Sequence, residues 1–108
     1  MIELIEKVKL LHEKNNFKNN GGEDKLYRMA LIMEEVGEIC EVITKNRGDI
    51  GKEHADLLIL LLGNCVAYGI DIVKLANQKL DEILDLESTV TDNYARIITT
   101  KSEKDLEY

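Results

Sequence analysis

Two pairs of acidic side chains have the spacing that metal chemistry requires. Glu35 and Glu38 lie three residues apart, and Glu53 and Asp56 repeat that spacing further along the chain. Residues three apart in an α-helix point to the same side. Each pair therefore presents two carboxylates together, and two such helices packed side by side would bring four carboxylates to one place.

Acidic pairs at this spacing are common in a chain so rich in acids, and most of them are solvated. The chain has 108 residues, with 21 Asp and Glu against 14 Lys and Arg, which gives a net charge of −7. Glu3 with Glu6, and Glu82 with Asp85, are interpreted as such surface pairs. The other two pairs differ because their neighbours on the helix face are apolar.

Four carboxylates held close together on apolar faces repel one another, and each raises the pKa of the others unless a proton or a cation is shared. The sequence therefore predicts a divalent cation bound by Glu35, Glu38, Glu53 and Asp56. No His or Cys stands one helical turn away on the same face, which disfavours zinc and the Glu-x-x-His di-iron pattern. Ligands that are all oxygen favour Mg²⁺, with Mn²⁺ as the alternative.

The chain has no proline, so glycine and asparagine mark the ends of its helices. The predicted helices span residues 2–15, 24–46, 52–68 and 72–87. The second and third of these carry the acid pairs and are apolar round nearly their whole surface. We therefore expect an all-α fold, a four-helix bundle-like subunit in which these two helices form the central, antiparallel pair.

The chain is expected to form one helical domain over residues 1–87, followed by a C-terminal arm over residues 88–108. The structure of this arm is left open by its sequence. Ile97, Ile98, Thr99 and Thr100 favour an extended segment. Ser102 and Asp105, in contrast, would suit the start of a last short helical turn.

Composition narrows the classes of partner. Hydrophobic residues make up 44% of the chain while the interior of a domain of this length is small, so we expect some apolar surface to be buried between the subunits of a homodimer or homotetramer. The acidic balance argues against binding to nucleic acid. The most apolar run, Leu57–Leu62, is too short to span a membrane. Cys40 and Cys65 lie in apolar helical patterns, which indicates buried, reduced thiols and a cytoplasmic protein.

Other polar residues on apolar faces have two interpretations each. Lys79 lies within the apolar arc of the last predicted helix, where its stem covers apolar surface or its ammonium group binds a phosphate near the metal. Asn64 shares a face with Glu53 and would contact the substrate or satisfy a neighbouring backbone group. His12 and His54 are predicted to be buried and hydrogen-bonded.

The acid pairs also stand in a pattern that resembles a known family. The chain reads Glu34-Glu35-Val36-Gly37-Glu38, then fourteen residues, then Glu53-His54-Ala55-Asp56-Leu57-Leu58. This pattern resembles the EExxE…ExxD signature of the MazG-type all-α nucleoside triphosphate pyrophosphohydrolases. The turn Tyr68-Gly69-Ile70-Asp71, followed by Lys79, resembles that family's junction between its third and fourth helices. The resemblance covers roughly residues 25–82.

The resemblance implies an enzyme that hydrolyses the phosphoanhydride bond of a nucleotide. The reaction would be Mg²⁺-dependent and convert an NTP or dNTP to the monophosphate and pyrophosphate. The family's metal ligands correspond to the same four acids, and Glu38 is our choice for the base that activates water. Lys79 would offset negative charge on the leaving pyrophosphate. The resemblance also implies a homodimer or dimer of dimers with sites at helix interfaces.

The chain departs from the family pattern after Lys79. Family members often carry an Asn and an Arg soon after this lysine, whereas the corresponding stretches here read Asp81-Glu82-Ile83 and Leu84-Asp85-Leu86. A phosphate-binding donor is therefore either missing or supplied from elsewhere in the chain. The candidates are Arg47, Lys52 and Arg96.

Two other functions compete with this prediction. The related phosphoribosyl-ATP pyrophosphatases carry out the same chemistry on a different substrate, and the resemblance to that branch is weaker. The other alternative is a non-catalytic helical binding module that keeps the metal site, which the missing Asn and Arg would favour.

Overall fold

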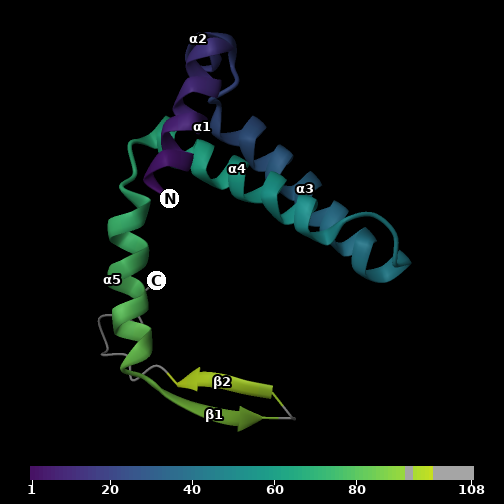
Figure 1. The fold of residues 1–108 in the computed structure, drawn as a ribbon, viewed down its shortest axis with the longest axis vertical. Helices are drawn as coiled ribbons and strands as arrows, with labels where there is room; N and C mark the ends of the chain where they lie inside the picture. Colours follow the sequence, from purple (N-terminus) through teal and green to yellow (C-terminus); the bar gives the residue numbers. More distant parts are fainter. Residues whose placement is uncertain (92–93, 99–108) are drawn as a thin grey trace. The chain divides into compact units, whose positions relative to one another are not determined.

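The computed structural model describes residues 1–91 and 94–98. The described residues form five helices and one hairpin, in the order shown in Figure 1. The helices are α1 (Ile2–Lys14), α2 (Phe17–Asn20), α3 (Lys25–Lys45), α4 (Ile50–Tyr68) and α5 (Ile72–Leu84). The predicted all-α fold is therefore confirmed. Among the described segments, no single helix is long and apolar enough to cross a membrane.

The chain divides into two compact units, Met1–Ile72 and Val73–Tyr108. The first contains α1 to α4. In the second, α5 is followed by an antiparallel hairpin of β1 (Glu87–Thr91) and β2 (Tyr94–Ile98). Ile97 and Ile98 lie in β2, in agreement with the extended alternative for this segment. Thr99, Thr100, Ser102 and Asp105 lie outside the described residues.

Helix ends follow from local hydrogen bonds, and some differ from the prediction. The Asp49 carboxylate accepts hydrogen bonds from the backbone N–H groups of Gly51 and Lys52 at 2.9 and 3.2 Å. This N-cap starts α4 at Ile50, two residues earlier than predicted. Asn15–Gly22, predicted as a loop, contains the one-turn α2. The last helix ends at Leu84, three residues earlier than predicted.

The first unit is built on the antiparallel pair α3 and α4, which lie side by side and are joined by a loop of only four residues (Figure 1). The predicted pairing of these two helices is confirmed. Helix α1 packs against α4. Of the apolar side chains that the structure describes, only Val8, Ile32 and Leu62 are buried, and none of them is completely inaccessible to solvent. The core of the single chain is therefore small for its content of hydrophobic residues.

A buried arginine clamps α3 to α4. The Arg28 side chain is 3% exposed and donates three hydrogen bonds. Its Nε donates to Asn64 Oδ1 at 2.6 Å, its Nη2 to the Leu60 carbonyl at 2.9 Å, and its Nη1 to the Gly22 carbonyl at 3.1 Å. None of the ion pairs in the described part of the chain involves Arg28. The buried charge therefore depends on neutral oxygens that only this alignment of the two helices brings together.

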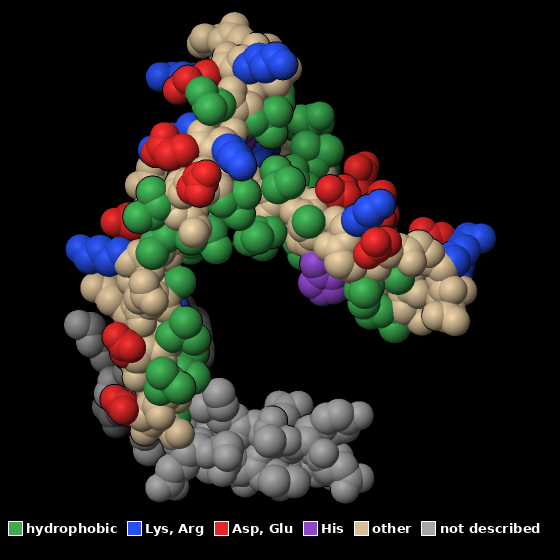
Figure 2. Space-filling view, viewed as in Figure 1, with side chains coloured by type: hydrophobic (Ala, Val, Ile, Leu, Met, Phe, Trp, Pro, Cys, Tyr) green, Lys and Arg blue, Asp and Glu red, His purple; other side chains and the backbone are tan. Residues whose placement is uncertain are grey.

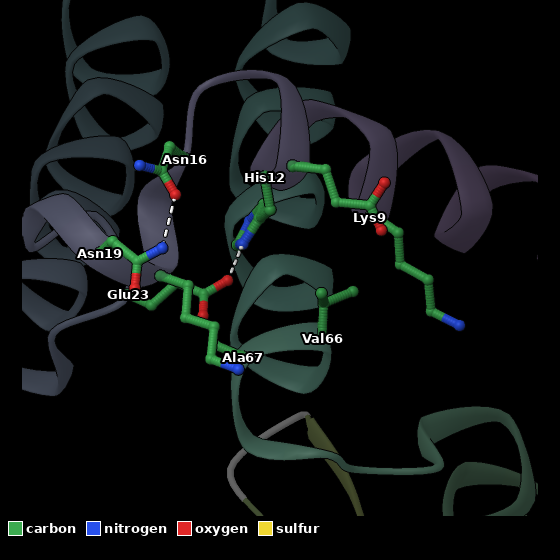
Figure 3. Close-up of a pocket in the computed structure, with 9 residues that line it drawn as sticks. Lys9, His12, Asn16, Asn19, Glu23, Val66 and Ala67 are labelled. Atoms are coloured by element: carbon green, nitrogen blue, oxygen red, sulfur yellow. Dashed lines mark hydrogen bonds and ion pairs between the residues drawn. The ribbon is translucent and has the colours of Figure 1, made fainter.

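A buried histidine joins α1 to the same region. His12 is 5% exposed, and its Nδ1 lies 2.7 Å from Glu23 Oε2, as Figure 3 shows. The Phe17 ring packs edge-on against the imidazole, with 5.1 Å between ring centroids. The predicted buried, hydrogen-bonded state of His12 is confirmed. Gly63 of α4 leaves the space that His12 and Arg28 fill.

Three burial predictions were wrong for the single chain. His54 is exposed, and its Nδ1 lies 2.7 Å from the Ile50 carbonyl one turn earlier in α4. Cys40 is exposed, whereas Cys65 is half-buried; both thiols are free. The side of α3 that faces away from α4 also exposes its hydrophobic residues. These differences share one cause, because the single chain covers only one side of its two longest helices.

Replacement of Gly63 by alanine tests the contact between α1, α3 and α4. A Cβ at this position would lie 2.8 Å from His12 Nε2 and even closer to Arg28 Nη2. Alanine favours a helix over glycine by about 1 kcal/mol, but overpacking costs about 1–3 kcal/mol. We expect Gly63→Ala to lower the free energy of unfolding in urea. A variant more stable than the wild type would contradict the packing described above.

Candidate metal centre

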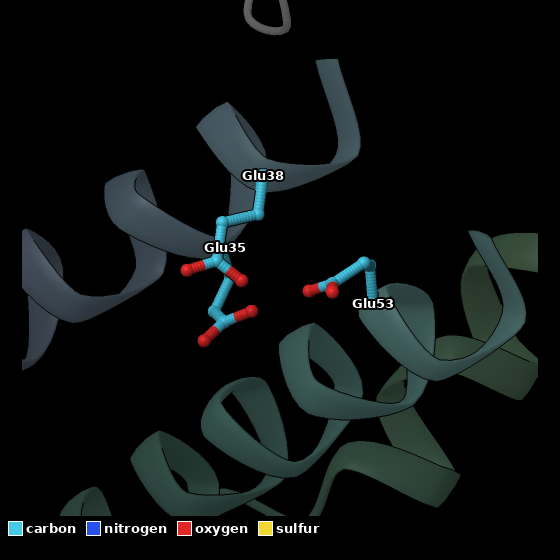
Figure 4. Close-up of side chains that lie close together, drawn as sticks. All are labelled: Glu35, Glu38 and Glu53. Carbon is cyan, nitrogen blue, oxygen red and sulfur yellow. The ribbon is translucent and has the colours of Figure 1, made fainter. Parts of the chain in front are cut away.

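Three carboxylates meet where α3 and α4 face each other. Glu35 and Glu38 come from α3 and Glu53 comes from α4, and the three point toward one another in Figure 4. Each offers one oxygen, and these oxygens all lie within 4.8 Å of one another. The same-face spacing of the first pair and the antiparallel packing of the helices together produce this convergence.

The burial of these carboxylates leaves two oxygens without a partner. Glu35 and Glu53 are half-buried, and the Oε2 atom of each is inaccessible to solvent. Neither atom has a hydrogen-bond partner within the described part of the chain. A buried carboxylate oxygen without a partner is costly, and a bound cation would remove that cost. Glu38 is exposed and closes the cluster on its solvent side.

Crowding of like charges raises two pKa values. The pKa of Glu53 is raised from 4.5 to about 7, first by hydrogen bonding with Glu38 and then by burial. The negative charges of Glu38, Glu35 and Asp56 add to this effect. The pKa of Glu35 is also raised, chiefly by burial and then by the charges of Glu38 and Asp56. The cluster thus takes up positive charge, as a proton or as a cation.

The fourth predicted ligand, Asp56, lies beside this cluster and outside the group of three that converge. Its charge reaches Glu35 and Glu53, because it raises the pKa of both. Asp56 and Glu38 are exposed in the single chain, although the sequence places both on apolar faces of their helices. The cluster therefore has a buried side and a side open to solvent.

Neither of the two predicted substrate-binding residues belongs to the group of three converging carboxylates. Asn64 Oδ1 accepts the hydrogen bond from Arg28 Nε, so this oxygen already holds the α3–α4 clamp. Lys79 lies on α5, in the second unit, and its contact with a phosphate stays a prediction.

Arg28 is a residue that reasoning from the sequence missed. It precedes Glu35 by seven residues, which is two helical turns, and so lies on the same face of α3. An arginine on an otherwise apolar face was the available signal. By bonding Asn64, which follows Glu53 on the same face of α4, Arg28 aligns the two helices that carry the acids.

Described residues of the first unit line a cavity of about 410 Å³ that opens beside the acids. Its lining residues are Glu38, Glu41, Val42, Arg47, Gly48 and Glu53. A second cavity, of about 470 Å³, lies beside His12 and reaches Val66 (Figure 3). Val66 follows Glu53 by thirteen residues, which places it about 20 Å further along α4. The two lysines of this second cavity, Lys9 and Lys18, are balanced by Glu13 and Glu23, so only the first cavity adjoins the chemistry of the acids.

The ligand atoms fit a hard divalent cation. The cluster offers oxygen alone, and its two orphaned oxygens are free to bind a metal. Mg²⁺ and Mn²⁺ prefer this ligand type, and both leave positions for water and phosphate oxygens. His54 Nδ1 is engaged with a backbone carbonyl, so it adds no nitrogen ligand from that atom.

Comparison with known proteins agrees with this chemistry. Residues 1–83 match the phosphoribosyl-ATP pyrophosphohydrolase family. The chain belongs to this family. It is therefore a pyrophosphohydrolase, an enzyme that acts on a phosphoanhydride bond, within the all-α MazG-like superfamily. Enzymes of this kind generally use divalent metals. No curated protein and no solved structure matches the chain.

The family match modifies the prediction made from the acidic signature. The reaction class is confirmed, but the MazG-type branch is not, since the match falls on the phosphoribosyl-ATP branch to which the resemblance was weaker. The match extends through α1 to α4 and into α5, as far as residue 83. A non-catalytic module is disfavoured by membership of an enzyme family.

The raised pKa of Glu53 predicts how stability depends on pH in metal-free protein. Between pH 4.5 and about 7 the folded chain keeps a proton on Glu53 that the unfolded chain has lost. Stability should therefore fall as pH rises through this interval. Glu53→Gln removes this contribution, so its melting temperature should decline less over the same interval, and Mg²⁺ should stabilise it less at pH 8.

Thermal melts of both proteins at pH 5, 6, 7 and 8, with EDTA or with Mg²⁺, check this prediction. Identical pH profiles for the wild type and Glu53→Gln would contradict the description of the cluster.

Proposed function

We propose that the chain hydrolyses phosphoribosyl-ATP to phosphoribosyl-AMP and pyrophosphate, with Mg²⁺ or Mn²⁺ bound by Glu35, Glu38, Glu53 and Asp56. The observation that carries this proposal is the convergence of three carboxylates, two with orphaned buried oxygens, in a chain of this family. The substrate is taken from the activity after which the family is named.

The chain's own residues would act from the open side of the cluster. A water molecule attacks the α-phosphorus of the triphosphate, the bond from this phosphorus to the α–β bridging oxygen breaks, that oxygen leaves with pyrophosphate, and a water proton passes to a carboxylate. Glu38 is our choice for this base, because it is exposed and lines the adjoining cavity. The bound cation supplies neutralisation of the phosphate charge. Lys79 would offset charge on the departing pyrophosphate.

A second substrate class is favoured by one observation. The segments that carry the acids read as the EExxE…ExxD signature, and this pattern resembles that of enzymes acting on common NTPs or dNTPs. The same carboxylates would serve both substrates, because the bond that breaks is the same. Only the part of the site that binds the base and its substituent would differ.

We also propose that two copies of the chain associate through α3. The buried apolar core of the single chain is small, and hydrophobic side chains reach the surface of its helices (Figure 2). On one side of α3, six exposed hydrophobic residues recur every three or four positions. They are Leu26, Met29, Met33, Val36, Cys40 and Ile43. A stripe of this length and spacing suits a second, identical helix.

Alanine variants of the acids test the catalytic proposal. Glu35→Ala, Glu38→Ala, Glu53→Ala and Asp56→Ala should each lower pyrophosphate release by about 100-fold or more, because the ligands act as one unit. Double variants should lose little more than single ones. The assay measures pyrophosphate from phosphoribosyl-ATP and from a panel of NTPs and dNTPs, with Mg²⁺ and with Mn²⁺.

Two further variants calibrate this experiment. Lys79→Ala should cost less, about 10-fold to 100-fold, because it removes one electrostatic contact and leaves the metal in place. Glu34→Ala is the control: this carboxylate is exposed and outside the converging group, so its loss should change activity less than twofold. Wild-type activity in all four acid variants would refute the assignment of the site.

A charge in the middle of the α3 stripe tests the assembly. Met33 is 60% exposed in the single chain and lies at the centre of the stripe. We expect a dimer or tetramer for the wild type and dissociation of the copies for Met33→Glu, because two buried carboxylates would face each other. Light scattering at micromolar concentration measures the oligomeric state of the wild type and of Met33→Glu. A monomeric wild type would rule out the proposed association.

A further inference from the structure

The loop between α3 and α4 places one cation beside the acids. Arg47 lines the cavity of about 410 Å³ together with Glu38 and Glu53. It is the sole cationic residue among the described residues that line this cavity. Of the three donors considered from the sequence, Lys52 does not line it, and Arg96 belongs to β2 in the other unit.

The backbone of this loop holds Arg47 at the mouth of the cavity. Asn46 ends α3 in the left-handed region, with φ at 49°, and Gly48 follows with φ at 95°. A Cβ on Gly48 would lie 3.0 Å from a methyl group of Val42, so the loop passes close over the end of α3. The next residue, Asp49, caps α4. The position of the Arg47 backbone is therefore fixed from both sides.

The Arg47 side chain is free to leave its present partner. Its Nη2 lies 3.7 Å from Glu41 Oε1, and the side chain is 71% exposed, so this ion pair is weak. Glu41 has a closer partner, since Lys45 Nζ lies 2.8 Å from the same oxygen. The pKa of Glu41 is lowered mainly by its hydrogen bond with Lys45, and less by Arg47. Release of Arg47 would leave Glu41 paired.

We infer that Arg47 is a substrate-binding residue whose guanidinium binds the phosphate chain of the nucleotide in the cavity that Arg47 lines together with Glu38 and Glu53. This inference rests on the proposed function and adds the donor that helix α5 lacks after Lys79. Guanidinium groups suit this task because they donate two parallel hydrogen bonds to phosphate oxygens. A polyphosphate held between the acids' cation and Arg47 has its negative charge matched on both sides.

Variants of Arg47 and a charge-matched control test this assignment. Arg47→Met should raise KM about 10-fold or more, with a smaller change in kcat. The KM of Arg47→Lys should lie between the KM values of the wild type and Arg47→Met, because lysine keeps the charge and loses the paired hydrogen bonds. Lys52→Met removes the same charge from an exposed site outside the cavity and should behave as the wild type. Binding of Mn²⁺ to substrate-free protein should be unchanged in all three.

Titration of inorganic tripolyphosphate into Mg²⁺-loaded protein separates the role of Arg47 from the identity of the reaction. If the wild type hydrolyses no nucleotide, the proposed function fails, yet a 10-fold weaker affinity of Arg47→Met for tripolyphosphate still supports the assignment. Equal tripolyphosphate affinity for Arg47→Met and Lys52→Met overturns it. Loss of Mn²⁺ binding in Arg47→Met would also overturn the assignment of Arg47. A wild-type protein that binds no tripolyphosphate would overturn it as well.

Discussion

The first unit depends on the crowding of like charges between two packed helices. Glu35, Glu38 and Glu53 are brought within a few ångströms by the antiparallel packing of α3 and α4, and two of their oxygens are buried without a partner. In the absence of a cation this arrangement opposes folding, and the raised pKa of Glu53 is its signature. A bound divalent ion would turn the same repulsion into attraction, so the cost of the site in metal-free protein would favour metal binding.

Something must hold the helices together against that repulsion, and the buried Arg28 does so. It lies two turns from Glu35, bonds Asn64 and the Leu60 carbonyl of α4, and has no carboxylate partner among the described residues. Its hydrogen bonds require one particular alignment of the helices, because a shift of one residue would leave the buried charge unpaired. The hydrogen bonds of Arg28 therefore fix the alignment of α3 and α4 that brings the acids together.

Much of this could be predicted from the sequence, for identifiable reasons. Glu35 and Glu38 follow from helical spacing alone, and the short connection around Gly48 required antiparallel neighbours, so the meeting with Glu53 was predictable. The hydrogen bonds of Arg28 were not predictable, because an arginine on an apolar face does not indicate which carbonyl oxygens will accept its hydrogen bonds. Exposure was also misjudged at Cys40 and His54, since a wheel measures how apolar a face is and not whether a partner covers it.

The branch of the superfamily to which the chain belongs was the least predictable from the sequence. The residue types of the acidic signature and of the Gly69 turn suit a cation and a helix junction, so they do not distinguish one nucleotide substrate from another. Reaction class therefore followed from a few residues, whereas the branch followed only from the match over residues 1–83.

We propose that the carboxylates of Glu35, Glu38 and Glu53 share one divalent-cation site. Anomalous diffraction from a crystal grown with Mn²⁺ tests it most directly, because it locates the ion without reference to activity. We predict a strong anomalous peak at about 2.2 Å from carboxylate oxygens of Glu35, Glu38 and Glu53, and no such peak in a crystal of Glu53→Gln grown with the same Mn²⁺. A peak elsewhere in the chain, or none at saturating Mn²⁺, would contradict the account.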